Sequence, residues 1–232
     1  MPPNISVLAD YAYSEILNMI LSSKIKPGER IREDLLAEEL GISRTPVREA
    51  VNRLTQNGFV TNIMRKGIYC VQVTKEDLLH LLDLRIVLES LSFERCAELA
   101  TEKDWEAFRS IIDEFHAKFN SILRLNNSSA GKKIALLHNE YDVRFHVGIA
   151  EISGSKRLIK YINEVENLLL IARQRIYKND DEGIDIVLLS WKQHELILNF
   201  LRSGDKDSAK EILCKHLMLM RDTQVNVDDT ML

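Results

Sequence analysis

The 232-residue chain is poor in residues that interrupt helices and in residues that cross-link chains. It has four Pro and nine Gly, which favours long helices. Its three cysteines, Cys70, Cys96 and Cys214, are far apart and form no C-x-x-C pair. This spacing excludes a disulfide framework and a thiolate zinc site, so we expect the cysteines to be small core residues.

Long apolar runs are missing as well. No window approaches the roughly 18 uninterrupted apolar residues of a membrane-spanning helix. The first residues, MPPNISVLADYAYSEIL, have neither the basic leader nor the apolar core of a signal peptide. The sequence therefore predicts a cytoplasmic protein with no membrane partner.

The formal net charge of the chain is −4, but the balance of positive and negative residues differs along the sequence. Residues 1–73 hold nine Lys and Arg against eight Asp and Glu, and residues 41–70 hold five basic residues against Glu49 alone. A locally basic stretch in an acidic chain is compatible with a polyanionic partner at that place.

The periodicity of apolar residues and the turn signals predict a mostly α protein. The N-terminal part has the pattern of three helices and a hairpin, at 10–22, 33–40, 44–57 and 59–73. Only helices are expected afterwards, at 75–99, 103–125, 134–152, 156–177, 184–201 and 208–223. The prediction is a winged helix-turn-helix domain (1–73) followed by an all-α helical-bundle domain (74–232).

The third predicted helix has the surface of a DNA-reading helix. Its apolar residues recur at helical spacing: Val47, Ala50, Val51 and Leu54. Arg44, Thr45 and Arg48 therefore face outward on its first turns, where Arg can bind guanine with two hydrogen bonds and hydroxyls suit phosphate. In the hairpin, Arg65 and Lys66 can add phosphate or minor-groove contacts. The simpler alternative is a solvated basic face without a partner.

The segment PGERIREDLLAEELGISRTPVREAVNRLTQNGFV, with the KG that follows, resembles the winged helix-turn-helix of the GntR family, and SRTPVREAVNRL is its most specific part. The resemblance covers residues 9–73. It implies operator contacts from the start of the recognition helix and from the wing glycine: Ser43, Arg44, Thr45, Arg48 and Gly67.

One position departs from this family pattern. Some members have a base-reading Arg in the second helix, and the matching place here is Asp34. A carboxylate would repel phosphate there, so that contact is expected to be absent and the operator to differ. Arg32 lies nearby and is a candidate substitute.

Polar residues recur on helix faces that should be buried. Asp142 and His146 share a face with Phe145 and Ile149, and two later helices place histidines in the same way: His194 and His216. Burying an unpaired carboxylate costs several kcal/mol or forces its protonation. A divalent metal removes this conflict, because imidazole nitrogen and carboxylate oxygen suit Zn, Ni, Mn or Fe.

The alternative is a set of core histidines that are satisfied by ordinary hydrogen bonds, with an Asp–His pair among them. His138, four residues before Asp142 on the same face, is a spare ligand candidate. His80 and His116 are expected to be structural or exposed.

Residues 74–223 resemble the all-helical FCD domain of FadR-type GntR regulators. The metal pattern of that domain, D-x-x-x-H followed by two further His, is matched by Asp142, His146, His194 and His216. Arg85 can form an i, i+4 ion pair with Glu89, worth a few tenths of a kcal/mol. In similar FCD domains an Arg of this helix meets an effector carboxylate, which implies that a small organic acid binds at Arg85.

These observations predict a ligand-responsive DNA-binding transcriptional regulator, a repressor, that binds operator DNA as a homodimer because one recognition helix reads only a few base pairs. The alternative is a metal-dependent enzyme in the helical domain fused to a DNA-binding module. No nucleophile elbow, Gly-rich phosphate loop or second carboxylate–histidine motif supports an enzyme. An architectural DNA-binding protein would leave the buried polar residues without a purpose.

Overall fold

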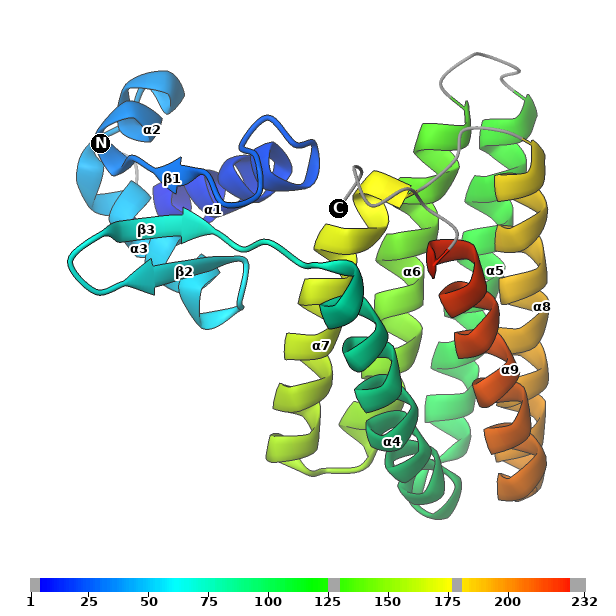
Figure 1. The fold of residues 1–232 in the computed structure, drawn as a ribbon. Coiled ribbons are helices and arrows are strands. Elements are labelled where there is room, and N and C mark those ends of the chain that lie inside the picture. Colours follow the sequence, from blue (N-terminus) through cyan, green and yellow to red (C-terminus); the bar gives the residue numbers. More distant parts are fainter. Residues whose placement is uncertain (1–4, 125–129, 177–180, 226–232) are drawn as a thin grey trace. The chain divides into compact units, whose positions relative to one another are not determined.

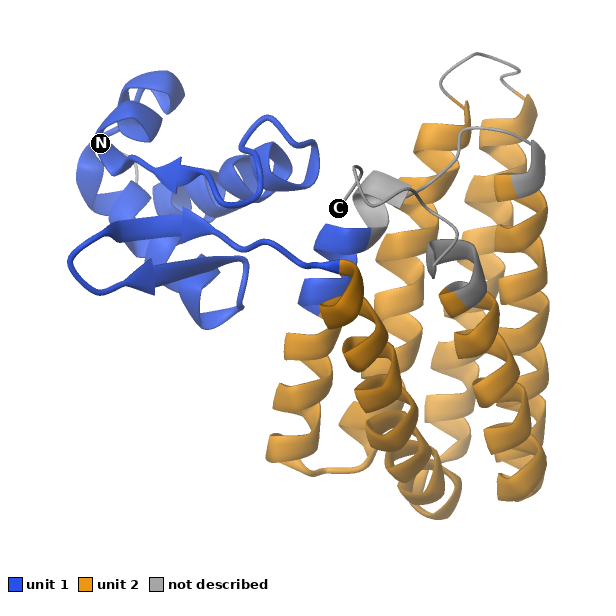
Figure 2. Ribbon diagram, viewed as in Figure 1, with its two compact units in different colours: residues 1–74, 167–174, 232 blue, residues 75–166, 175–231 orange. Residues whose placement is uncertain are grey.

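The computed structural model describes residues 5–124, 130–176 and 181–225. The described part contains nine helices and one small sheet of three strands, which confirms the mostly α fold (Figure 1). The chain divides into two compact units (Figure 2). One contains residues 1–74 and 167–174, and the other contains residues 75–166 and 175–231.

The N-terminal unit is a three-helix winged fold. Its elements are α1 (Ile5–Leu21), β1 (Arg30–Ile31), α2 (Glu33–Leu40), α3 (Arg44–Gln56), β2 (Val60–Ile63) and β3 (Gly67–Cys70). Helices α1 and α3 pack through fully buried apolar side chains, among them Ile16, Val47 and Leu54. Gly41 ends α2 with a φ of 66°, a left-handed conformation that glycine adopts without strain, and it turns the chain toward α3.

The three strands form an antiparallel sheet in the order β1-β3-β2. The hairpin predicted at 59–73 is present, with Ile63 paired to Gly67, and helix α1 begins five residues earlier than expected. Strand β1 was not predicted. It is only two residues long, too short to show an alternating pattern, and it forms because Arg30 and Ile31 pair with Tyr69 and Ile68 of β3.

The second unit is a helical bundle. Its helices are α4 (Lys75–Leu99), α5 (Glu102–Arg124), α6 (Ala130–Ile152), α7 (Lys156–Ile176), α8 (Asp181–Ser203) and α9 (Lys206–Val225). The segment NNSSAGKK, 126–133, has the composition of a loop; 126–129 lie outside the described residues, and 130–133 instead belong to α6, which starts four residues before its predicted beginning. The spacing of Thr101 and Asp104 predicts a capping arrangement at the start of α5, and it is confirmed, because the Thr101 backbone N–H donates to Asp104 Oδ2 at 2.7 Å.

Helix α6 contacts α4, α5 and α8, and α4 contacts α8 and α9. Helices α4, α6 and α8 run in one direction, and α5 and α9 run in the opposite one (Figure 1). The core between them is aromatic: Phe115 and Trp191 stack with ring centroids 4.0 Å apart, next to the buried Phe145. Among the described residues, no helix is both long enough and apolar enough to cross a bilayer.

Candidate functional site

Four polar side chains converge inside the bundle. Asp142 and His146 come from α6, His194 from α8 and His216 from α9, and none is more than 1% exposed. One ligand atom of each lies within 4.8 Å of the others. The structure therefore brings together the four residues that the sequence singled out as metal ligands.

Asp142 Oδ1 is the common point of this cluster. It lies 3.3 Å from His194 Nε2, 3.5 Å from His146 Nε2 and 3.7 Å from His216 Nε2. The Nε2 atoms of His146 and His194 are 3.0 Å apart. Ligand atoms about 2.1 Å from one ion are about 3.0 to 3.4 Å apart at octahedral or tetrahedral angles, so these separations fit a small divalent cation.

The protonation of two of the histidines also fits a metal. Burial lowers the pKa of His194 to about 4 and lowers the pKa of His216 well below its usual value, so both rings are neutral at pH 7. Burial, the largest effect on His146, disfavours its charge, but the carboxylates of Glu89 and Asp142 together outweigh burial and raise the pKa of His146 to about 9. The buried carboxylates thus favour positive charge at the centre of the cluster.

Glu89, on α4, orients one of the candidate ligands. Its Oε2 lies 2.5 Å from His146 Nδ1, which leaves Nε2 of this ring directed at Asp142 and His194. Metal-binding histidines commonly donate their second N–H to a carboxylate in this way. On the α9 side, Gln193 Oε1 lies 3.3 Å from Nδ1 of His216.

Arg85 is buried beside the same cluster, 1% exposed. Its Nε contacts Glu89 and lies 2.7 Å from Glu166 Oε1, and its Nη2 donates to Asp142 Oδ2 at 3.3 Å. Burial opposes its charge, but the carboxylates of Glu166, Glu89 and Asp142 raise the pKa of Arg85 above its usual value. Its Nη1 is also buried and has no hydrogen-bond partner among the described residues.

The sequence singled out Arg85 as the residue that meets an effector carboxylate, with an i, i+4 ion pair to Glu89 as the simpler alternative, but it assigned Glu89 no role at the cluster and did not find Glu166. The signal for Glu89 was present, because it lies on the same face of α4 as the apolar core residues, four positions after Arg85. Glu166 had no such signal, because its contact with Arg85 exists only after α4 and α7 pack.

The other histidines lie outside the cluster. The Trp191 Nε1–H donates to Nδ1 of the buried His138 at 3.1 Å. His116 is half-buried with its Nε2 3.1 Å from Glu195 Oε1, and His80 is exposed. None of the three belongs to the group of side chains that could share an ion.

The predicted DNA-reading side chains lie on the surface of the N-terminal unit. Arg44, Thr45 and Arg48 are exposed on α3, and Lys66 is exposed in the wing turn. Ser43 is the N-cap of α3, but its side chain makes no capping hydrogen bond, and the first turn of α3 contains no acidic residue. Backbone N–H groups and positive charge are therefore available to a phosphate at this helix end.

A hollow of about 590 Å³ joins this helix end to the wing and is lined by Arg30, Arg44 and Gly67, among others. Arg32 and Asp34 also line it, but Arg32 Nη2 donates to Asp34 Oδ2 at 2.8 Å, so these two charges compensate each other. The repulsion expected from Asp34 is thereby reduced.

Arg30 is a residue that sequence reasoning missed. Its side chain lies against Gly67, where an added Cβ would be 3.1 Å from Arg30 Nε. Gly67 also has a φ of 114°, in the left-handed region. Glycine at 67 therefore serves the wing turn and leaves room for the exposed Arg30 guanidinium in the same hollow as Arg44.

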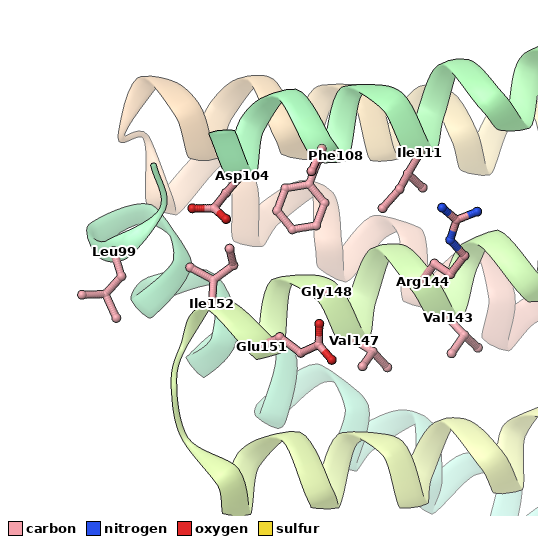
Figure 3. Close-up of a pocket in the computed structure, with 11 residues that line it drawn as sticks. Leu99, Asp104, Phe108, Ile111, Val143, Arg144, Val147, Gly148, Glu151 and Ile152 are labelled. Carbon is pink, nitrogen blue, oxygen red and sulfur yellow. The ribbon is translucent and has the colours of Figure 1, made fainter. Parts of the chain in front are cut away.

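A larger hollow, of about 730 Å³, lies between α5 and α6 and involves none of the predicted site residues (Figure 3). Phe108 points toward Gly148, whose missing Cβ would lie 3.0 Å from Phe108 Cε1. Arg144, at one end, donates to Glu114 at 3.3 Å. This hollow lies on the face of α6 away from Asp142 and His146.

Two family models match the chain. The model described as "Bacterial regulatory proteins, gntR family" matches residues 8–70, and the model of the FCD domain matches residues 80–218.

Named relatives extend over most of the chain. The Nta operon transcriptional regulator of Aminobacter aminovorans is 29% identical over 199 residues, which cover 86% of each chain. The gluconate operon transcriptional repressor of Bacillus licheniformis is 25% identical over 219 residues, which cover 93% of this chain and 83% of the relative. Among solved structures, E. coli McbR/YncC has the same fold, with a TM-score of 0.70, 19% identity and coverage of 91% of this chain and 93% of that one.

Replacing Arg30 with Ala should weaken DNA binding without changing sequence preference, because a phosphate contact is the same at every sequence. We expect the slope of log K against log salt concentration to become shallower by about 0.9, the value for one lost phosphate contact. Fluorescence anisotropy measures both the sequence preference and the salt slope. It is carried out with a mixed-sequence duplex and with a duplex that the wild-type protein selects from a random pool. Lys24→Ala, which removes one charge already paired with Glu39, is the matched control. An unchanged slope in Arg30→Ala would show that Arg30 makes no phosphate contact.

Replacing Glu89 with Gln should lower metal affinity about 10- to 100-fold, because His146 loses the carboxylate that orients its ring. Competition with a chromogenic chelator measures this affinity for Zn²⁺ and Ni²⁺. Glu98→Gln on the same helix, which removes an exposed partner of Lys206, should leave it unchanged. Equal affinities in the two variants would contradict the role of Glu89.

Proposed function

Since the chain belongs to the GntR family of bacterial regulatory proteins and carries an FCD domain, we propose that it is a homodimeric repressor controlled by a divalent metal and a small organic acid. Family membership makes it a DNA-binding transcriptional regulator, as the sequence predicted. Its named relatives are regulators rather than enzymes, which confirms the prediction that it is not an enzyme. We place it in the cytoplasm, where a bacterial regulator meets its operator.

The observation that carries the metal proposal is the convergence of Asp142 Oδ1 with three Nε2 atoms in a fully buried space. One carboxylate oxygen and three imidazole nitrogens suit Zn, Ni, Mn or Fe, and a bound cation would displace the proton that His146 otherwise holds. When bound, such an ion supplies a Lewis-acidic point that accepts a carboxylate or hydroxyl oxygen of a ligand. Asp142, His146, His194 and His216 would hold it, and Glu89 would orient His146.

The acid proposal rests on Arg85. Its Nη1 retains a buried donor, and a guanidinium is the side chain best suited to carboxylate. The other nitrogens of Arg85 contact three protein carboxylates, so an incoming acid would use Nη1 or compete with one of those carboxylates. One named relative, the gluconate operon repressor of Bacillus licheniformis, takes its name from the operon of an organic acid.

Coupling to DNA is proposed to run through α4. This helix carries Arg85 and Glu89 next to the metal ligands, and it begins at Lys75, directly after residues 1–74 of the N-terminal unit. A ligand that pulls Asp142 or Arg85 toward itself would shift α4. This shift would change the DNA affinity of the N-terminal unit. Coupling between two sites typically amounts to about 1–3 kcal/mol, which is about 5- to 150-fold in operator affinity.

The homodimer has a candidate surface on α4. Leu84, Val87 and Leu91 are exposed at helical spacing, with Val87 68% exposed. Exposed apolar stripes of this kind commonly mark interaction surfaces. We propose that this stripe contacts a second copy of the chain, because two recognition helices are needed to bind two operator half-sites.

Replacing His194 with Ala should abolish metal retention and the response of DNA binding to acids, because the cation loses one of four ligands, while operator binding without ligand survives. Elemental analysis and anisotropy titrations check this. His116→Ala, a half-buried histidine outside the cluster, is the control. Loss of folding in His194→Ala, seen by circular dichroism, with metal content per folded chain unchanged, would assign His194 a structural role instead.

Replacing Val87 with Glu should convert the dimer into a folded monomer and weaken binding to a two-half-site duplex, because a charge cannot be buried unpaired between two apolar stripes. Light scattering coupled to gel filtration measures the mass. Leu196→Glu, at an exposed leucine of α8, is the matched control and should stay dimeric. A dimeric Val87→Glu protein would place the interface elsewhere.

A further inference from the structure

The turn that joins β2 to β3 carries an exposed apolar side chain at its tip (Figure 1). Met64 is 84% exposed, the highest value among the large apolar residues that the structure describes. It lies between Ile63, which is 40% exposed, and the exposed cations Arg65 and Lys66. Single exposed apolar residues are common on protein surfaces, so exposure alone does not mark a binding site. Two further features of the turn point to a partner.

The first feature is a backbone that holds Met64 in a defined place. The Lys66 N–H donates to the Ile63 carbonyl at 2.9 Å, which closes the turn, and the Tyr69 hydroxyl donates to the Lys66 carbonyl at 3.4 Å. Arg65 has a φ of 64°, in the left-handed region that residues other than Gly, Asn and Asp rarely adopt. The turn thus keeps a cation where a glycine would fit without strain, and such strained residues cluster at functional sites.

The second feature is the charge around Met64. Residues 59–73 contain no Asp or Glu, so Arg65 and Lys66 are the only ionised side chains of the hairpin. Gly67, which follows them, lines the basic hollow between α3 and the wing, so Met64 continues the surface that carries the candidate phosphate contacts. An apolar tip beside two cations suits a polyanion with an apolar interior, which describes the stacked bases of a DNA duplex.

We propose that Met64 is a wedge that enters between two base pairs from the minor groove, partly unstacks them and kinks the operator. The proposal rests on DNA binding by the N-terminal unit and adds a specificity-determining residue to it. Apolar side chains, Met among them, unstack base steps in this way in other minor-groove proteins, and the bent duplex then contacts more protein surface. Arg65 and Lys66 would contact the phosphates next to the kink.

A wedge of this kind selects DNA by deformability. Pyrimidine–purine steps such as TA and CA unstack easily, whereas A-tracts are stiff. Met64 would therefore favour a flexible step at a position where no side chain forms a hydrogen bond with a base.

The test uses the full-length protein and a duplex that the wild-type protein selects from a random pool. The fluorescent base 2-aminopurine replaces each adenine in turn and reports unstacking by a rise in fluorescence, and energy transfer between dyes at the two duplex ends reports bending. We expect a rise at a TA or CA step and a shorter end-to-end distance when the wild type binds. Replacing that step with AA should weaken binding by at least about fivefold, the low end of the effect of one base pair.

Variants at Met64 separate the wedge from the neighbouring cations. Met64→Gln has a polar side chain of the same length and should lose the fluorescence rise, the bending and the fivefold preference. Met64→Leu keeps an apolar side chain and should retain all three. Val7→Gln, at a residue of α1 that is 59% exposed, is the matched control and should behave as the wild type.

Two results would overturn the wedge alone. The wild type could bind the selected duplex without a fluorescence rise at any adenine, or the rise and the bending could persist in Met64→Gln, which would assign the distortion to other DNA contacts of the protein. Failure of DNA binding gives a different result, because the wild type would then select no duplex from the pool, and the wedge would be overturned together with it.

Discussion

A single buried carboxylate organises the interior of the helical unit. Asp142 Oδ1 faces three imidazole nitrogens, and its Oδ2 accepts a hydrogen bond from Arg85. A carboxylate at 1% exposure is tolerated only when its charge is compensated, and here Arg85 of α4 and His146 of α6 carry the opposite charge, with the neutral rings of His194 and His216 beside them. Asp142 thus connects side chains from four helices, α4, α6, α8 and α9.

The same need links the interior to the remainder of the chain. Arg85 and Glu89 belong to α4, the helix that follows the N-terminal unit directly in sequence. Glu166 belongs to α7, the helix that residues 167–174 continue. Asp142 is thus linked, directly through Arg85 and indirectly through Glu166, to helices α4 and α7. Under the proposed function, this link is the route by which ligand binding would act on DNA binding.

In the N-terminal unit, by contrast, the charged groups proposed to contact DNA lie on the surface. Arg30, Arg44, Arg48 and Lys66 are exposed, and DNA phosphate is their proposed partner. The hollow between α3 and the wing combines Arg30 and Arg44 with a compensated Arg32–Asp34 pair, so positive charge is concentrated where the backbone can approach. Gly67 contributes by the absence of a side chain, because an added Cβ would be only 3.1 Å from Arg30 Nε.

The sequence by itself determined the mostly α fold, the hairpin at 59–73 and the cap at Thr101, because these features depend on residues close together in the chain. It also identified Asp142, His146, His194 and His216, since a polar residue on an apolar helix face can be recognised from spacing alone. Strand β1, the contact of Arg30 with Gly67 and the participation of Glu166 were decided only by the tertiary structure. Each joins residues far apart in sequence, and no local pattern records which distant surfaces will meet when helices pack.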